Sequence, residues 1–351
     1  MGFKRLDPED FLISSDAVSQ TVWSNNTATL NEFYTSSAQN VASISGDYYL
    51  VVYQTASNST DASPQFDLAY GDKTSGGAVY FNDAVTDRSP SSTVYGQYRS
   101  LVLEDETADF TFGTATEVEY IYAMPIERSR YKEKLLPGSF NITLQGSLGN
   151  PIYLTDNSKE VTVPDYFGSQ RAYQIVRTND ANTFGISNNI NGGYTTSYGS
   201  YGLYLPDTGL IIFNGQALDL GPGQPIDTAA DYGIGLGTNR SLNTDANNSG
   251  KLYNAISKGA SFKVNCEETL SSDFVFVRAR NAEFNYSENP SYIQGTTGEV
   301  YWNYFINSPQ SYITTVGLYN DNNDLLAVAK LSKPLPKDFT KEALIRVKLD
   351  F

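Results

Sequence analysis

The chain has 351 residues, a net charge of −15 and a pI near 4.4, and it contains no histidine and a single cysteine, Cys266. So acidic a chain lacks the Lys and Arg surplus that binding to a phosphate backbone requires, which excludes nucleic acid as an expected partner. Without histidine, Ser-His-Asp and Cys-His catalysis and His-ligated zinc are excluded, and one cysteine cannot form an intrachain disulfide or a cysteine-cluster metal site.

The composition is typical of a mainly β protein. Aromatic residues make up 13% of the chain, with 26 Tyr, whereas charged residues make up only 18%. Tyr and Thr favour half-buried strand positions, and Gly, Asn and Asp supply the left-handed conformations that tight turns need. The length predicts more than one domain. We therefore expect β-sandwich-like domains with short helical segments and a loop-rich middle part.

Residues 1–149 are predicted to form an N-terminal β domain. A strand is expected in Ala17–Trp23, and the continuous apolar run Tyr48–Tyr53 predicts a strand covered on both faces. Two further runs, Phe66–Tyr70 and Ala78–Phe81, flank a Gly-rich turn and predict a hairpin.

The stretch from Tyr95 to Leu144 has the densest structural signal. Four short apolar runs have strand spacing, namely Leu101–Leu103, Phe110–Phe112, Tyr120–Tyr122 and Phe140–Leu144. Between the last two, Pro125 can start a helix and Pro137-Gly138 can end it. The same segment also fits a strand, because its cations alternate with period two.

Those cations, Arg128, Arg130, Lys132 and Lys134, are the only basic cluster in the first half of the sequence. They follow a segment, Met1–Glu127, that holds 18 Asp and Glu against five Lys and Arg. Charge runs are usually solvated or paired within the molecule. The alternative is a docking patch for an acidic copy of the chain or another partner, since complementary charge sets register and association rate.

Residues 150–260 are predicted to form a loop-rich insertion with recurrent Gly, Asn and Tyr. Four tyrosines lie between small residues, namely Tyr194, Tyr198, Tyr201 and Tyr204. They could form a glycan or protein contact surface, or they could pack in the ordinary way. Asp245–Gly250 matches the first half of a calcium loop, but Ile256 stands where a bidentate Glu is needed, so we expect no metal site and no cofactor.

Residues 261–351 are predicted to form a C-terminal β domain. Strands are expected at Phe262–Val264, Phe274–Arg280, Val300–Ile306, Tyr312–Tyr319 and Leu325–Leu331, and in the alternating run that ends the chain. The two strands joined by Asp321–Asp324 give the clearest hairpin. Six Lys and Arg between Lys330 and Asp350, against three Asp and Glu, form a second basic patch.

Neither a signal-peptide core nor an apolar run long enough to span a membrane occurs in the sequence, so we expect no membrane partner. One cysteine suits a protein matured in a reducing cytosol. A buried, inert thiol is the favoured interpretation of Cys266 over a nucleophile.

Four segments together carry a resemblance to a known class of proteins: YGQYRSLVLEDE, ERSRYKEKLLPGSFNITL, VRARNAEFNYSENPSYI and YITTVGLYNDNNDLLAVAKLSKPLPKDFTKEALIRVKLDF. They resemble virion structural proteins of contractile-tailed, T-even-like phages, particularly those of marine cyanobacteria. The resemblance implies a tail or baseplate subunit that is assembled in the host cytoplasm and contacts copies of itself and other virion proteins. It brings no catalytic or ligand-binding motif, so no enzyme is expected.

Two alternatives remain open on the sequence. A receptor- or glycan-binding fibre or decoration protein would use the Tyr194–Tyr204 region at the host surface. A polysaccharide-cleaving tail protein would need paired carboxylates, for which Glu104, Asp105, Glu106 and Asp109 are the candidates.

Overall fold

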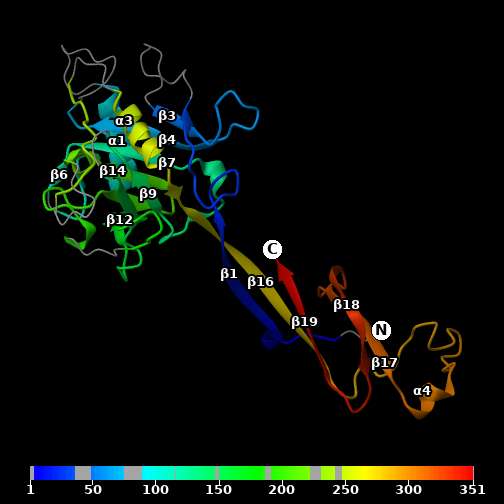
Figure 1. The fold of residues 1–351 in the computed structure, drawn as a ribbon. Helices are drawn as coiled ribbons and strands as arrows, with labels where there is room; N and C mark the ends of the chain where they lie inside the picture. Colours follow the sequence, from blue (N-terminus) through cyan, green and yellow to red (C-terminus); the bar gives the residue numbers. More distant parts are fainter. Residues whose placement is uncertain are drawn as a thin grey trace. The chain divides into compact units, whose positions relative to one another are not determined.

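The structure is a computed structural model that describes residues 4–35, 49–74, 89–114, 116–146, 150–185, 191–221, 231–241 and 247–350. The protein is mainly β (Figure 1). It divides into two compact units: a large unit, Val18–Glu268, and a small unit, made of Met1–Ala17 and Thr269–Phe351. Both divisions fall inside strands, β1 (Phe11–Thr21) and β16 (Asn265–Ala279).

This division differs from the boundaries predicted at 149/150 and 260/261. Residues 150–260 contribute strands to the same sheet as residues 49–144, so they are not a separate insertion. The physical reason is that the apolar runs of the middle part, such as Leu210–Phe213, are fully buried in the core of the large unit.

One antiparallel sheet of eleven strands dominates the large unit. Its order is β15 (Phe262–Lys263), β9 (Asn141–Leu144), β10 (Ile152–Asp156), β12 (Gln170–Thr178), β13 (Gly202–Leu205), β14 (Leu210–Asn214), β7 (Tyr120–Pro125), β4 (Pro64–Asp72), β3 (Tyr49–Tyr53) and β2 (Tyr34–Thr35), with β11 (Asp165–Phe167) beside β12.

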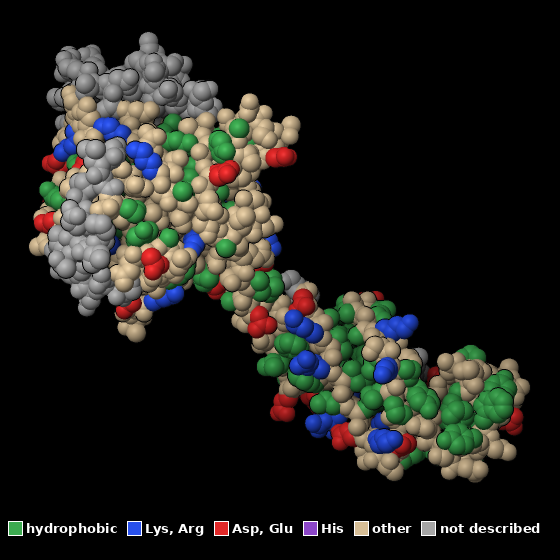
Figure 2. All heavy atoms as spheres, in the orientation of Figure 1, with side chains coloured by type: hydrophobic (Ala, Val, Ile, Leu, Met, Phe, Trp, Pro, Cys, Tyr) green, Lys and Arg blue, Asp and Glu red, His purple; other side chains and the backbone are tan. Residues whose placement is uncertain are grey.

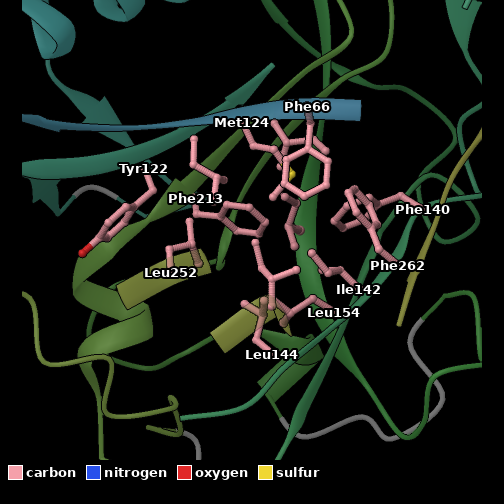
Figure 3. Close-up of a cluster of buried hydrophobic side chains, with 14 of the residues drawn as sticks. Phe66, Tyr122, Met124, Phe140, Ile142, Leu144, Leu154, Phe213, Leu252 and Phe262 are labelled. Atoms are coloured by element: carbon pink, nitrogen blue, oxygen red, sulfur yellow. The ribbon is translucent and has the colours of Figure 1, made fainter. Parts of the chain in front are cut away.

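The sheet curls until its two ends meet. Leu30, shortly before the end strand β2, exchanges two backbone hydrogen bonds of 2.9 and 3.0 Å with Phe262 in the opposite end strand β15. The Trp23 indole N–H also donates to the Phe262 carbonyl, at 3.1 Å. We call this junction the seam. The sheet that it closes surrounds an inner core around Phe66, Phe140 and Phe213 (Figure 3).

Both faces of the central strands of the sheet, such as β7, β13 and β14, are buried. In β7, Tyr122 and Met124 point into the inner core, whereas Ile121 and Ala123 belong to a second core on the outer face. Because successive residues of a strand point to opposite faces, a strand covered on both sides is apolar throughout. This explains why Leu210–Phe213 shows no alternation. The prediction that the run Tyr48–Tyr53 is covered on both faces is wrong for its described part, because in β3 only Leu50 and Val52 are buried and Tyr49 is 41% exposed.

Helix α1 (Pro90–Leu103) covers part of the outer face. Its N-cap Ser89 accepts a hydrogen bond from the Ser92 N–H. The Tyr95 hydroxyl donates to the Val118 carbonyl at 3.0 Å. The predicted strand at Leu101–Leu103 is therefore wrong. The run forms the last turn of α1. Of its three residues only Val102 is buried, and Val102 follows the buried Tyr95 by two helical turns.

Helix α3 (Asn248–Gly259) packs its Leu252, Ala255 and Ile256 side chains into the inner core. The predicted helix after Pro125 is only a 3-10 turn, η3 (Arg128–Arg130), followed by the short strand β8 (Lys134–Leu135). The remaining elements of the large unit are β5 (Phe110–Thr111), β6 (Glu117–Val118), η4 (Asn191–Gly193) and α2 (Gly215–Asp219).

The small unit contains β19 (Ala343–Asp350), which pairs with β16, and the hairpin β17 (Ser311–Tyr319) and β18 (Leu325–Lys337). The hairpin is the one predicted. The strand predicted at Val300–Ile306 is wrong, because this segment contains α4 (Asn303–Asn307), whose apolar side chains are mostly exposed and not covered by a sheet. A 3-10 turn, η1 (Pro8–Asp10), precedes β1.

Three predictions fall wholly or partly outside the described residues. They are the hairpin strand Ala78–Phe81, the first residue of Tyr48–Tyr53, and Asp245 of the calcium-like segment.

Candidate interaction surfaces

The predicted basic cluster is largely committed to contacts within the large unit. Lys132 Nζ lies 2.8 Å from a Glu268 carboxylate oxygen, and Lys134 lies 3.9 Å from Glu267, its partner in the pairing of β8 with β16. Arg128 donates to the carbonyls of Tyr131 and Lys132 and stacks over the Tyr131 ring at 4.6 Å. Three of the four cations thus fit the interpretation of an internally paired face.

Arg130 is the exception. Within the described residues its guanidinium hydrogen-bonds only to the Ser129 hydroxyl, at 3.3 and 3.4 Å. It lines a pocket of about 250 Å³ whose other walls are Ser129, Tyr131, Lys132, Cys266, Glu268, Asn26, Val18 and residues 20–24. A docking role for the cluster stays a prediction that would rest mainly on Arg130.

Cys266 lies half-buried in the wall of this pocket. Its thiol donates to the Gln20 carbonyl at a sulfur–oxygen distance of 3.6 Å, and burial raises the pKa of Cys266 above its ordinary value. A raised pKa keeps the sulfur protonated, and the protonated thiol is a poor nucleophile. The favoured interpretation of an inert thiol fits this environment.

The predicted tyrosine row is not one surface. Tyr201 and Tyr204 are fully buried, and their hydroxyls donate to the carbonyls of Tyr232 and Leu136. Tyr194 and Tyr198 are half-buried, and Tyr198 packs against the inner core. The contact interpretation is wrong for Tyr201 and Tyr204, because Tyr204 lies in the central strand β13, Tyr201 directly precedes it, and both side chains belong to the inner core.

Exposed apolar side chains are concentrated in the small unit instead. Of 23 exposed large hydrophobic residues in the described chain, 17 belong to the small unit, although this unit holds only about a third of all described residues. The core of the small unit is correspondingly modest, with Val275, Val316 and Val347 at its centre. Green side chains cover much of this unit in Figure 2.

Three places contribute most of this surface. The strand β1 starts with the exposed run Phe11–Ile13, and the hairpin exposes Tyr319, Leu325, Leu326 and Val328. The third place is the segment between β16 and β17, which we call the aromatic segment (residues 281–310). Its exposed side chains include Phe284, Tyr286, Tyr301, Trp302, Tyr304 and Ile306.

The hairpin surface was readable in the sequence. In LLAVAKL, apolar residues point to both faces of the strand. Ala329 and Leu331 pack on the small core, while Leu326 and Val328 are exposed on the other face. In a two-stranded hairpin with one face on a core, an apolar second face is left in water.

The base of the aromatic segment is held by Lys337, which is fully buried. Its Nζ donates to the carbonyls of Asn281 and Asp338, each at 3.0 Å, and to the Asn285 side-chain oxygen at 2.8 Å. Three acceptors match the three donors of an ammonium group. The segment is therefore anchored to the end of β18 at one defined point.

Three of the four candidate catalytic carboxylates are used in separate contacts, and Glu106 is exposed. Glu104 accepts hydrogen bonds from the Ser169 N–H and hydroxyl, Asp105 accepts from Thr107, and Asp109 pairs with Lys73 at 2.5 Å. Across the described residues, no group of three or more Cys, Asp or Glu side chains is arranged to hold a metal ion.

A different carboxylate, Asp67 on β4, has a perturbed acidity. Burial, with a smaller contribution from Glu127, raises the pKa of Asp67 to about 6. Because the folded state holds this proton more tightly than the unfolded chain, stability falls as pH rises from about 4 to above 6. We expect Asp67→Asn to raise the free energy of unfolding at pH 7 by about 1–2 kcal/mol, discounted for partial solvent access, and to leave it unchanged near pH 4.

Urea unfolding at both pH values measures this effect. Asp61→Asn, at an exposed carboxylate elsewhere in the large unit, is the matched control and should change stability little at either pH. An equal gain for Asp67→Asn at pH 4 and pH 7 would show that protonation is not its cause.

Comparisons with protein-family models, with curated proteins and with solved structures found no match to this chain. In the described ranges, no helix is long and apolar enough to cross a membrane.

Proposed function

We propose that the protein is a structural subunit of a contractile-tailed phage virion, in the tail or baseplate, and that it acts through contacts with copies of itself and with other virion proteins. The observation that carries the subunit role is the concentration of exposed apolar side chains in the small unit. The assignment to a phage particle rests on the sequence resemblance.

A small unit with a modest core and a large apolar surface is suited to an assembly. Each Å² of apolar surface removed from water contributes roughly 25 cal/mol, so covering the hairpin face stabilises the unit itself as well as the contact. Interfaces of permanent assemblies are large and apolar for this reason. The subunit should therefore be more stable assembled than alone.

The full chain should self-associate, and polar substitutions on the hairpin should weaken the association. We expect Leu326→Ser combined with Val328→Thr to raise the dissociation constant about tenfold or more, since both side chains would be covered in the contact. Sedimentation equilibrium over a concentration series measures it.

Val161→Thr combined with Val163→Thr is the control, because both residues are exposed in the large unit, Val163 at 71%. This control should associate like the unmodified chain. An unmodified chain that stays monomeric up to about 100 μM, where even weak complexes are populated, would count against self-association.

A receptor- or glycan-binding protein is the second candidate, and the aromatic segment favours it. Trp302 and Tyr304 expose 61% and 64% of their surface, and residues 281–310 contain three Glu and no Lys or Arg. Flat aromatic faces with polar tips suit a sugar ring. Binding of the chain to isolated host-surface polysaccharide would distinguish this candidate from a purely structural subunit.

A further inference from the structure

The small unit has two free strand edges. In its sheet, β16 lies between β1 and β19, and no strand in the described part of the chain pairs with the outer edge of either. A free edge presents unpaired backbone N–H and C=O groups that can accept another strand. Each edge is therefore a site for strand addition.

The two edges carry opposite charge. The small-unit part of β1 carries the single charged residue Asp16, and three further acids, Asp7, Glu9 and Asp10, directly precede the strand. On β19, Arg346 and Lys348 are accompanied by the single acid Asp350. Asp16 and Arg346 are both exposed, and neither has an ion-pair partner within the described ranges. The free charge on one edge thus complements the free charge on the other.

Both edges also expose apolar side chains. Phe11, Leu12 and Ile13 are consecutive and all exposed, so β1 is apolar on both of its faces there. On β19, Leu344 is exposed beside Arg346, whose guanidinium lies 5.2 Å from the centre of the Phe274 ring. An apolar edge of this kind is a liability in a monomer, and natural proteins normally protect it.

We propose that β1 of one copy pairs with β19 of a second copy, so that one sheet continues from subunit to subunit. The inference deepens the proposed function and rests on it. The partner is a copy of this chain because the two complementary edges lie on the same molecule. Since different surfaces meet, the contact is heterologous, and repeating it generates a ring or a helical filament.

Charge reversal tests the pairing. Asp16→Arg should place like charges at the junction, and so should Arg346→Asp, and each variant alone should raise the dissociation constant of the assembly about tenfold. An equimolar mixture of the two variants should assemble again, because every junction then joins opposite charges. The double variant should assemble for the same reason. Asp61→Arg, in the large unit, is the control, and far-UV circular dichroism confirms folding of each chain.

The outcomes separate this inference from the proposed function. Assembly of the unmodified chain that neither single variant weakens would overturn edge pairing and leave the subunit role in place. Loss of assembly in both variants without recovery in the mixture or the double variant would also overturn it, as would loss in Asp16→Arg alone, which indicates pairing of two β1 strands. A chain that never self-associates would overturn both.

Discussion

Replacing Phe262 with Ala is expected to lower the free energy of unfolding of the large unit by about 3–5 kcal/mol. The Phe262 ring is fully buried, and its centre lies 4.8, 5.5 and 5.9 Å from the ring centres of Trp23, Phe66 and Phe140. Truncation would leave a cavity between three aromatic side chains that cannot all move inward. Its backbone also closes the seam with Leu30, so the loss falls where the ends of the sheet meet.

Urea unfolding followed by far-UV circular dichroism measures the loss. Phe339→Ala removes the same side chain from a position that is 59% exposed in the small unit, and it should change stability by no more than about 0.5 kcal/mol. Phe262→Leu should cost less than Phe262→Ala, because it leaves a smaller void. Hydrogen exchange at the Leu30 amide should accelerate in Phe262→Ala. Unchanged exchange there would contradict the role given to the seam.

The strands that could be predicted from the sequence are those marked by a local pattern of apolar and turn residues. Tyr120–Tyr122 and most of the predicted run Phe140–Leu144 lie in strands of the large sheet, and Asp321–Asp324 joins the hairpin of the small unit. In each case a short β-prone run is bounded by turn residues, and that information lies within about ten residues of chain. The mainly β character follows from the same local signals.

The closure of the sheet could not be predicted in this way. Leu30 and Phe262 are 232 positions apart, and neither neighbourhood carries a pattern that selects the other. The failure to predict helix α1 has a different cause, because the signal for this helix is local. Leu101–Leu103 has strand spacing, but Ser89-Pro90, an N-cap followed by a proline at the first helical position, marks the start of a helix that continues through it.

The candidate sites show the same limit. Lys132 is neutralised by Glu268, which is 136 positions away, so a cluster that is basic in the sequence is paired in space. Tyr201 and Tyr204 are core residues because the closed sheet buries their side chains in the inner core. The hairpin part of the apolar surface can be read from the pattern LLAVAKL, but the exposure of the aromatic segment depends on which faces stay uncovered, and this is a property of the whole fold.

Replacing Arg240 with Gln should have an effect as large as that of Phe262→Ala, about 3–5 kcal/mol, but through charge and not through packing. Asp72 is fully buried, and Arg240 holds it with two hydrogen bonds, from Nε at 2.7 Å and from Nη2 at 3.0 Å. The Tyr70 hydroxyl donates to the same carboxylate at 2.8 Å. Hydrogen bonding to Asp72 is the main reason that the pKa of Arg240 is raised. Without the guanidinium, a buried carboxylate would remain with one neutral side-chain donor from Tyr70 and the donors of Thr74.

A double-variant cycle separates two contributions to the lost stability: the contacts of Arg240 itself, and the cost of leaving the buried Asp72 carboxylate without a positive partner. Asp72→Asn combined with Arg240→Gln should recover much of the stability lost in Arg240→Gln alone, because no uncompensated buried charge is left. Arg171→Gln breaks the partly exposed pair with Asp207, 2.7 Å apart, and should cost at most about 1 kcal/mol. Urea unfolding of the four chains gives the coupling energy between positions 72 and 240. A double variant as unstable as Arg240→Gln would mean that the cost comes from the lost contacts of Arg240 with Glu119 and the Tyr120 ring, and not from the buried carboxylate.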